Sequence, residues 1–310
     1  RGLVVSNGIA PRYSDIDAGA MAAAAIDEAV RNAVCVGVDV DKIAGLDNFC
    51  WPDPIQSEKT PDGKFKLAQL VRANRELERI CRAYRLPCVS GKDSMKNDYG
   101  KGVDKISIPP TLLFSLFGDH PDVRNTATSD FKNPGDKIYL VGESLEELGA
   151  SEVSFMLREK TSTNGIGGSV PSLDNPEKLF QSYRALSSLI NSGIVKTAHD
   201  CSEGGLGVTL AEMCIGGRIG ANVDIDGTGN CSLWSRLWGE SLGRIVVAVS
   251  PQHESTFLNG MSGSTVTYLG NVEDSQLLNI IDGYEEIISV DVSTMVNSWQ
   301  GTLDMTGGGV

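Results

Sequence analysis

Apolar residues recur every three or four positions in two long stretches of the first third of the chain. This is the spacing of a helix with one buried face. The first stretch covers 18–36, is rich in alanine, and can be capped by Asp15 or Asp17. The second covers 66–84 and keeps its large apolar residues on one side. These two patterns predict two amphipathic helices.

Shorter apolar runs, bounded by glycine, proline and polar clusters, predict strands. In the first half the strand patterns lie at 3–13, 42–46, 87–90 and 106–117. In the second half strands are expected at 137–142, 194–198, 221–225, 244–249 and 264–269, and helices at 179–190, 206–215, 233–238 and 253–259. This mixed order of strands and helices predicts an α/β or α+β fold rather than a β-sandwich.

A polar, turn-rich segment at 119–136 suggests a connection between two domains, which suits a chain of 310 residues. The expected boundaries are 1–125 for the first domain and 126–300 for the second. Residues 301–310 are expected to be a linker or an artificial tail. The glycine-rich segment 143–177 has little periodicity and is expected to be a long, partly ordered loop.

Composition narrows the class of protein. The net charge of −13 argues against a nucleic-acid partner, and no apolar run reaches the roughly 18 residues of a membrane helix. The seven cysteines are odd in number and form no C-x-x-C pair, so we expect reduced thiols in a cytoplasmic protein. The first residue is Arg1 rather than methionine, which suggests a fragment of a longer protein.

The segment 199–205, with the sequence HDCSEGG, lies between a strand pattern and a helix pattern. Backbone N–H groups at a helix N-terminus attract an oxyanion or a phosphate. Asp200 and Ser202 flank this opening, and a carboxylate beside a phosphate commonly holds Mg²⁺. The alternative is an ordinary helix cap, which is the commoner use of this pattern.

A second candidate motif, GKDS, begins at Gly91 and follows the strand pattern at 87–90. As a turn it could clamp phosphates, with Lys92 as a point charge, or it could be a solvated charged loop. It is not a P-loop, because the spacing G-x-x-x-x-G-K-S/T is absent. Asp47 and Asn48 precede two prolines, so we expect them at a strand end that leads into a loop.

Two polar pairs in the first predicted helix are each four residues apart and therefore share a face. Glu28 and Asn32 carry hard oxygen donors that could bind a metal ion together, or they could be a polar pair on the helix surface. Asp27 and Arg31 are interpreted as an ordinary surface ion pair. Near the last strands, Glu240 is either a ligand contact or a loop acid.

Six segments occur together in one order, and their order is more specific than any one of them. They are AAIDEAVRN at 24–32, LDNFCW at 46–51, PCVSGKDSM at 87–95, IPPTL at 108–112, AHDCSEGG at 198–205 and WGES at 238–241. Over about 6–295 the chain resembles the C-terminal half of phosphoribosylformylglycinamidine synthase. That family lies in the superfamily of aminoimidazole ribonucleotide synthetase and selenophosphate synthetase.

The resemblance implies a ferredoxin-like N-terminal domain followed by a larger mixed α/β domain of the aminoimidazole ribonucleotide synthetase type. It also implies an ATP-dependent ligase of purine biosynthesis. ATP phosphorylates the amide oxygen of formylglycinamide ribonucleotide, and ammonia then displaces the phosphate to form the amidine. Catalysis of this type depends mainly on positioning and on charge neutralisation by Mg²⁺. The whole enzyme carries the two-domain unit twice, with two nucleotide sites.

Individual residues match the family's second nucleotide site, which holds a structural ADP in large members. The implied metal ligands are Glu28, Asn32 and Asp200, and Ser202 matches a nucleotide contact. An aspartate expected to bind metal upstream of the first helix falls near Asn7 and is not matched.

Other residues match contacts that complete the catalytic site of the other half. Asp47 and Gly91 match ATP contacts, and Ser94 matches a substrate contact. Lys92 stands where small members carry an asparagine metal ligand, so we expect it to contact nucleotide rather than metal. The family's catalytic histidine belongs to the first half, so no catalytic residue is expected in this chain.

The resemblance therefore implies the C-terminal half of an amidine-forming ligase, inactive alone. Its expected partners are the N-terminal half of the same enzyme and a glutamine amidotransferase domain or subunit that supplies ammonia. A second copy of this chain is a further candidate partner. One alternative is a structural, nucleotide-binding half whose bound ADP stabilises the fold. Another is a free-standing kinase or synthetase of the superfamily that acts as a homodimer.

Overall fold

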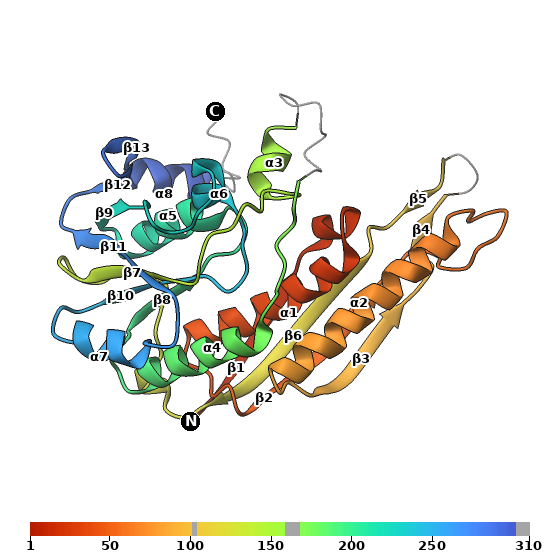
Figure 1. The fold of residues 1–310 in the computed structure, drawn as a ribbon, viewed down its shortest axis with the longest axis horizontal. Coiled ribbons are helices and arrows are strands. Elements are labelled where there is room, and N and C mark those ends of the chain that lie inside the picture. The colour runs from red at the N-terminus through yellow and green to blue at the C-terminus, as the bar shows by residue number, and fades with distance from the viewer. Residues whose placement is uncertain (101–103, 159–167, 302–310) are drawn as a thin grey trace.

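Two separate mixed sheets, one in each half of the chain, dominate the computed structural model (Figure 1). The structure describes residues 1–100, 104–158 and 168–301. The predicted two-part mixed α/β fold is therefore confirmed. No helix within those three ranges is long and apolar enough to cross a membrane.

The first sheet has four strands in the order β1-β6-β2-β3. Strand β6 runs antiparallel to β1 and β2, whereas β2 and β3 are parallel. A parallel pair needs a long crossover, and helix α2 supplies it. The elements are β1 (Gly2–Ile9), η1 (Pro11–Asp15), α1 (Ala18–Cys35), β2 (Ile43–Cys50), α2 (Gly63–Ala83), β3 (Cys88–Ser94), β4 (Asp98–Tyr99), β5 (Ile106–Ser107), β6 (Thr111–His120) and η3 (Val123–Asn125).

The connectivity of this sheet refines the expected ferredoxin-like description. Its elements follow one another as β-α-β-α-β-β, and the sheet is mixed. A ferredoxin-like unit has the order β-α-β-β-α-β instead. The difference arises because α2 joins two parallel strands and because the last strand, β6, inserts between β1 and β2.

The second sheet has seven strands in the order β13-β12-β9-β11-β7-β10-β8. Its strand pairs are antiparallel except for β12 with β9. The elements are β7 (Lys137–Val141), α3 (Glu152–Met156), α4 (Pro176–Asn191), β8 (Thr197–Asp200), α5 (Gly205–Gly217), β9 (Gly220–Asp224), α6 (Leu233–Trp238), β10 (Ile245–Val249), α7 (Glu254–Gly260), β11 (Val266–Glu273), β12 (Leu277–Asp282), β13 (Glu285–Asp291) and α8 (Val292–Gly301).

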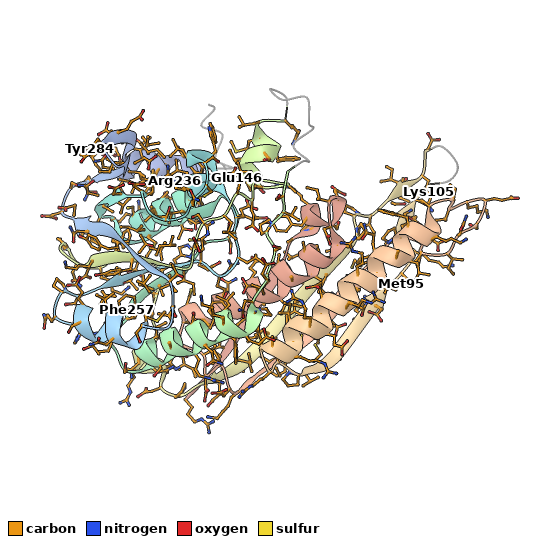
Figure 2. All side chains as sticks on the ribbon, in the orientation of Figure 1. Met95, Lys105, Glu146, Arg236, Phe257 and Tyr284 are labelled. Atoms are coloured by element: carbon orange, nitrogen blue, oxygen red, sulfur yellow. The ribbon has the colours of Figure 1, made fainter. Side chains whose placement is uncertain are left out.

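Strand β10 is buried along its whole length because helices cover both faces of the second sheet. Val246 and Ala248 enter a core with α5 and α8, whereas alternate residues such as Val247 enter the core formed with α4 and α7. In that second core Phe257 of α7 packs on Tyr139, with 5.2 Å between ring centroids (Figure 2). This core also includes α1, so one hydrophobic cluster is continuous across both halves of the chain.

Helix α1 lies at the centre of that shared cluster. Fifteen of its 18 residues are buried, because it packs on β1, β6, α2, α4 and β8. Its many alanines allow this close approach on several sides. Asp17 caps the helix, with its carboxylate accepting from the backbone N–H groups of Gly19 and Ala20.

Two predictions about the ends of strands were wrong. Asp47 lies inside β2 rather than at its end, and Gly91 lies inside β3 rather than in a turn. The reason is strand pairing. β2 stays hydrogen-bonded between β3 and β6 as far as Cys50, so the strand ends only just before Pro52 and Pro54. In the second half the prediction missed β12, β13 and α8.

Two other expectations concern loops and the tail. The 143–177 segment holds the short helix α3, and α4 begins before its end. Residues 159–167 of that segment and residues 302–310 of the expected tail lie outside the described residues.

Candidate nucleotide and metal site

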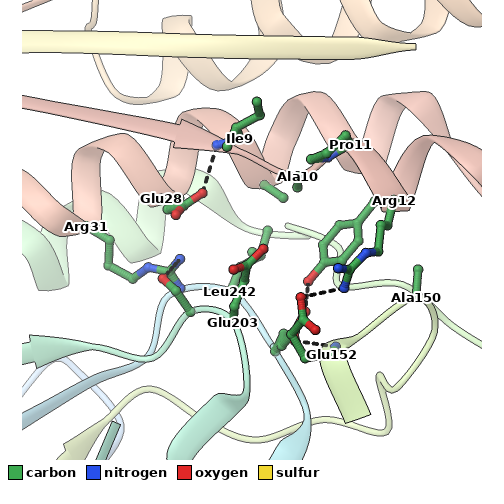
Figure 3. A pocket seen from close by; sticks show the side chains of 14 residues that line it. Ile9, Ala10, Pro11, Arg12, Glu28, Arg31, Ala150, Glu152, Glu203 and Leu242 are labelled. Atoms are coloured by element: carbon green, nitrogen blue, oxygen red, sulfur yellow. Dashed lines mark hydrogen bonds and ion pairs between the residues drawn. The ribbon is translucent and has the colours of Figure 1, made fainter. Parts of the chain in front are cut away.

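A cleft opens between α1 with η1 on one side and the turn from β8 to α5 on the other (Figure 3). Figure 3 shows Glu28 and Arg31 projecting from α1 toward Glu203 across the cleft. Its lining includes Arg12, Glu28, Arg31, Glu152, Ser202, Glu203 and Glu240. The structure thus brings Glu28 and Ser202, two predicted site residues from distant parts of the chain, into one pocket.

Glu28 is the acid of this cleft whose pKa departs most from its ordinary value. Its carboxylate accepts a hydrogen bond of 2.9 Å from the backbone N–H of Ile9. Burial raises the pKa of Glu28 to about 7, and the nearby charges of Asp200 and Glu203 act in the same direction. The site therefore concentrates negative charge that a bound cation would stabilise.

Asp200 ends β8 and is buried behind Ser202. Its carboxylate accepts hydrogen bonds from the Ser202 hydroxyl and from His199 Nδ1, the latter at 3.3 Å. Burial alone would raise the pKa of Asp200, but the hydrogen bond from His199 and the charge of Arg31 hold it at about 2. Asp200 is therefore an ionised carboxylate, as a metal ligand must be.

Arg31 links this acidic turn to α1. Its guanidinium donates to the carbonyl of Cys201 at 3.0 Å and to the Ser202 hydroxyl at 3.3 Å. It also lies 3.5 Å from the Asp27 carboxylate, and both side chains are almost fully buried. The interpretation of Asp27 and Arg31 as a surface pair was wrong, because α4 and the β8–α5 turn cover that face of the helix.

Asp27 is the centre of a buried polar network. It accepts hydrogen bonds of 2.7 Å from the hydroxyls of Tyr84 and Tyr183 and one of 3.1 Å from the backbone N–H of Gly243. These partners come from the residue that follows α2, from α4 and from the loop before β10. One carboxylate therefore joins the helices of the first sheet to the second half of the chain.

The glycine turn before α5 has the conformation that its sequence predicts. Gly204 and Gly205 have φ values of 79° and 65°, which glycine adopts without strain. The Gly204 N–H, expected to face a bound anion, donates instead to the Glu240 carboxylate at 3.0 Å. Glu240 also accepts from the Tyr13 hydroxyl at 2.7 Å and the Glu152 N–H at 2.9 Å, so it is a structural acid of the cleft wall.

The predicted metal ligands are only partly assembled. Asn32 lies one helical turn from Glu28 but is not among the cleft residues, and its amide nitrogen donates to the Asn7 carbonyl at 3.5 Å. Across the described residues, no three His, Cys, Asp or Glu side chains form a ready metal cage. The hard oxygens of Glu28 and Asp200 nevertheless fit Mg²⁺, which keeps several waters and uses one or two carboxylates with phosphate oxygens.

The other predicted site residues lie on the first sheet, apart from this cleft. Asp47 and Gly91 are paired in register, and a Cβ on Gly91 would come within 2.8 Å of the Asp47 carboxylate. Burial raises the pKa of Asp47. Lys92 donates to the Ser94 hydroxyl, and both lie on the opposite face, since successive strand residues alternate in direction. The predicted nucleotide and substrate contacts thus occupy two faces of β3.

Comparison with known proteins agrees with this arrangement. Residues 133–283 match the family described as AIR synthase related protein, C-terminal domain. The chain is 30% identical over 302 residues to the phosphoribosylformylglycinamidine synthase subunit PurL of Deinococcus radiodurans. The alignment covers 96% of this chain and 39% of that protein.

Solved structures share the fold. The Thermotoga maritima PurL complexed with FGAR aligns with a TM-score of 0.73 and 16% identity, over 95% of this chain and 46% of that one. The hydrogenase maturation protein HypE in complex with ATP aligns with a TM-score of 0.65 and 12% identity. The alignment covers 94% of this chain and 86% of the HypE chain. T. maritima PurL has also been solved with ATP, with ADP and as PurLQS.

The matched domain and the two-sheet fold define an AIR synthase-related protein, with the larger sheet domain of that type. Within this class the chain is similar to PurL, since it is 30% identical to the Deinococcus protein over 96% of its own length. The chain spans 39% of the length of that curated relative.

Proposed function

We propose that this chain is the C-terminal half of an ATP-dependent ligase that converts formylglycinamide ribonucleotide to formylglycinamidine ribonucleotide, and that it is inactive alone. The observation that carries the proposal is the meeting of Glu28 and Ser202 in one acidic cleft. Asp200 does not line that cleft, but it accepts a hydrogen bond from Ser202 and lies close enough to act electrostatically on Glu28. The 30% identity to PurL over 96% of the chain supports the same reaction. Residues 1–125 and 126–300 would be its two domains.

In this proposal the cleft holds ADP or ATP with Mg²⁺. Glu28, Asn32 and Asp200 would hold the cation, which neutralises the phosphate charge when bound. Ser202 would contact the nucleotide, and Arg31 keeps it in place through the hydrogen bond to its hydroxyl. A cation is needed because the cleft walls carry Glu28, Glu152, Glu203 and Glu240 against only Arg12 and Arg31.

The first sheet supports the proposed N-terminal partner half. The face opposite the helices exposes apolar side chains, with Leu3 75%, Val5 68% and Phe117 38% exposed. Exposed apolar surface of this kind marks protein interaction sites. Lys92 and Ser94 lie on that same face, so a partner bound there would meet these two proposed contacts, whereas Asp47 and Gly91 lie on the other face. A glutaminase subunit, as the PurLQS complex suggests, would supply ammonia.

The decisive experiment supplies the missing half. The chain should form amidine product from formylglycinamide ribonucleotide, ATP and ammonia only when mixed with an N-terminal half of a PurL protein. Turnover by the chain alone would favour the second candidate, a free-standing homodimer. HypE supports that candidate, because this chain covers 86% of its length with the same fold. Nucleotide binding without turnover in any mixture would favour a purely structural half.

Asp200→Asn tests the metal assignment. In the wild-type chain, ADP with Mg²⁺ at about 100 times its dissociation constant should add about 2.7 kcal/mol to the free energy of unfolding. The variant should lose this Mg²⁺-dependent gain, because it lacks the charge that binds the cation. Thermal melts with ADP, with and without Mg²⁺, measure the effect. Asp274→Asn, at an exposed aspartate, is the matched control and should keep the whole gain.

Gly91→Ala tests the proposed ATP contacts on β3. A methyl group there would push the Asp47 carboxylate aside, since it would lie 2.8 and 2.9 Å from its two oxygens. ATP affinity of the assembled enzyme should fall about tenfold or more, about 1.4 kcal/mol, with little change in melting temperature. Gly263→Ala, where nothing lies within 4 Å of the added Cβ, should leave both unchanged. Unaltered ATP affinity in Gly91→Ala would remove Asp47 from the site.

A further inference from the structure

Two cysteines outside the cleft lie in sulfur–sulfur contact. Cys81 is near the C-terminal end of α2 and Cys88 is the first residue of β3, and their sulfur atoms are 3.9 Å apart. The turn between them is tight: the Leu86 N–H donates to the Cys81 carbonyl at 2.9 Å, and Arg85 adopts a left-handed φ of 51°. The fold therefore holds the two thiols together, where the end of α2 meets the start of β3 (Figure 1).

This pair differs from the other cysteines in both contact and access. Among the described residues no other two cysteine sulfurs are in contact, and Cys35, Cys201 and Cys214 are buried. Cys88 is exposed, so a small oxidant can reach its sulfur directly. The hydrogen bond from Cys81 lowers the pKa of Cys88, and the same contact raises the pKa of Cys81. Cys88 is thus the more reactive sulfur, since the thiolate is the nucleophile.

We propose that Cys81 and Cys88 form a reversible disulfide through exchange with a low-molecular-weight disulfide, with Cys88 as the attacking sulfur and Cys81 as the resolving one. The Cys88 thiolate attacks one sulfur of the small disulfide, forms a mixed disulfide and releases one small thiolate. Cys81 then loses its proton to solvent and attacks the Cys88 sulfur, which releases the second small thiol. Two protein thiols are oxidised and one small disulfide is reduced to two thiols.

The position of this pair gives the disulfide a structural consequence. The Asp47 carboxylate is close enough to act electrostatically on both thiols. Gly91, the register partner of Asp47, follows Cys88 by three residues on the same strand. Oxidation would tie α2 to the start of β3 and replace two thiols beside Asp47 with one disulfide. Disulfide formation itself does not depend on the proposed nucleotide function, and the following test measures it directly.

The test treats the chain with glutathione disulfide, labels the remaining thiols with an alkylating reagent and maps the peptides by mass spectrometry. Cys81 and Cys88 should lose labelling together and appear as one linked peptide pair, and dithiothreitol should restore both. Cys81→Ser should stop at glutathione bound to Cys88, whereas Cys88→Ser should leave Cys81 labelled. Cys50→Ser, at a half-buried cysteine of β2, should behave like the wild-type chain.

Two outcomes would overturn the proposal. One is a wild-type chain that accumulates glutathione on Cys88 while Cys81 stays labelled. The other is loss of the two labels at independent rates, without a linked peptide. Both readouts come from the wild-type chain, so the test stands even if a serine variant folds poorly.

Discussion

Replacing Arg31 with methionine is expected to lower the free energy of unfolding by about 3–5 kcal/mol, because it leaves a buried charge without its counter-ion. Asp27 would keep its bonds from the hydroxyls of Tyr84 and Tyr183 but lose the opposite charge 3.5 Å away. The buried carbonyl of Cys201 would also lose its donor. Urea denaturation at neutral pH measures this loss.

The chain offers a matched control for this prediction. Arg82 and Glu78 of α2 form an ion pair with the same four-residue spacing, but their side chains are 79% and 63% exposed. Exposed pairs of this kind contribute little, so Arg82→Met should change the free energy of unfolding by no more than about 1 kcal/mol. Equal effects of the two substitutions would mean that burial of the Arg31 pair adds nothing to stability.

The contrast between these two pairs shows what the sequence could predict. Helix periodicity correctly predicted α1 and α2 and placed Asp27 and Arg31 on one face. It could not predict that this face is buried. The groups that cover it, Tyr183, Gly243 and the turn at Cys201, are far away in the sequence. Those contacts depend on how two sheets pack, and local spacing carries no information about such packing.

The candidate site was predictable to the extent that it follows local motifs. Asp200, Ser202 and the two glycines were proposed because a strand, a tight turn and a helix start leave a recognisable pattern. Tyr13 and Glu152 had no such signal, since their partners, Glu240 for both and Arg12 for Glu152, lie far away in the sequence. The end of β2 was misplaced for a similar reason, because ladder partners from β3 and β6 outweigh the nearby prolines.

Glu28→Gln is expected to change how stability depends on pH. The pKa of Glu28 is about 7 in the folded protein, above the ordinary value of 4.5, because the carboxylate is buried near other acids. The folded chain therefore binds this proton more tightly than the unfolded chain does. The resulting stability is fully present below pH 4.5 and is lost as the pH rises through about 7. The full loss corresponds to about 3 kcal/mol.

The glutamine side chain keeps the acceptor for the Ile9 N–H but does not titrate. The variant should therefore gain about 3 kcal/mol relative to the wild-type chain between about pH 4.5 and pH 8, measured as the difference in free energy of unfolding from urea denaturation. His199, whose pKa is raised to about 9, is common to both chains and cancels in that difference. Glu58→Gln, at an exposed glutamate, is the control and should show no such change. A constant difference across this range would contradict the raised pKa. If the cleft also binds Mg²⁺ with ADP as proposed, adding both at about pH 8 should stabilise only the wild-type chain, because the cation takes the place of the missing proton.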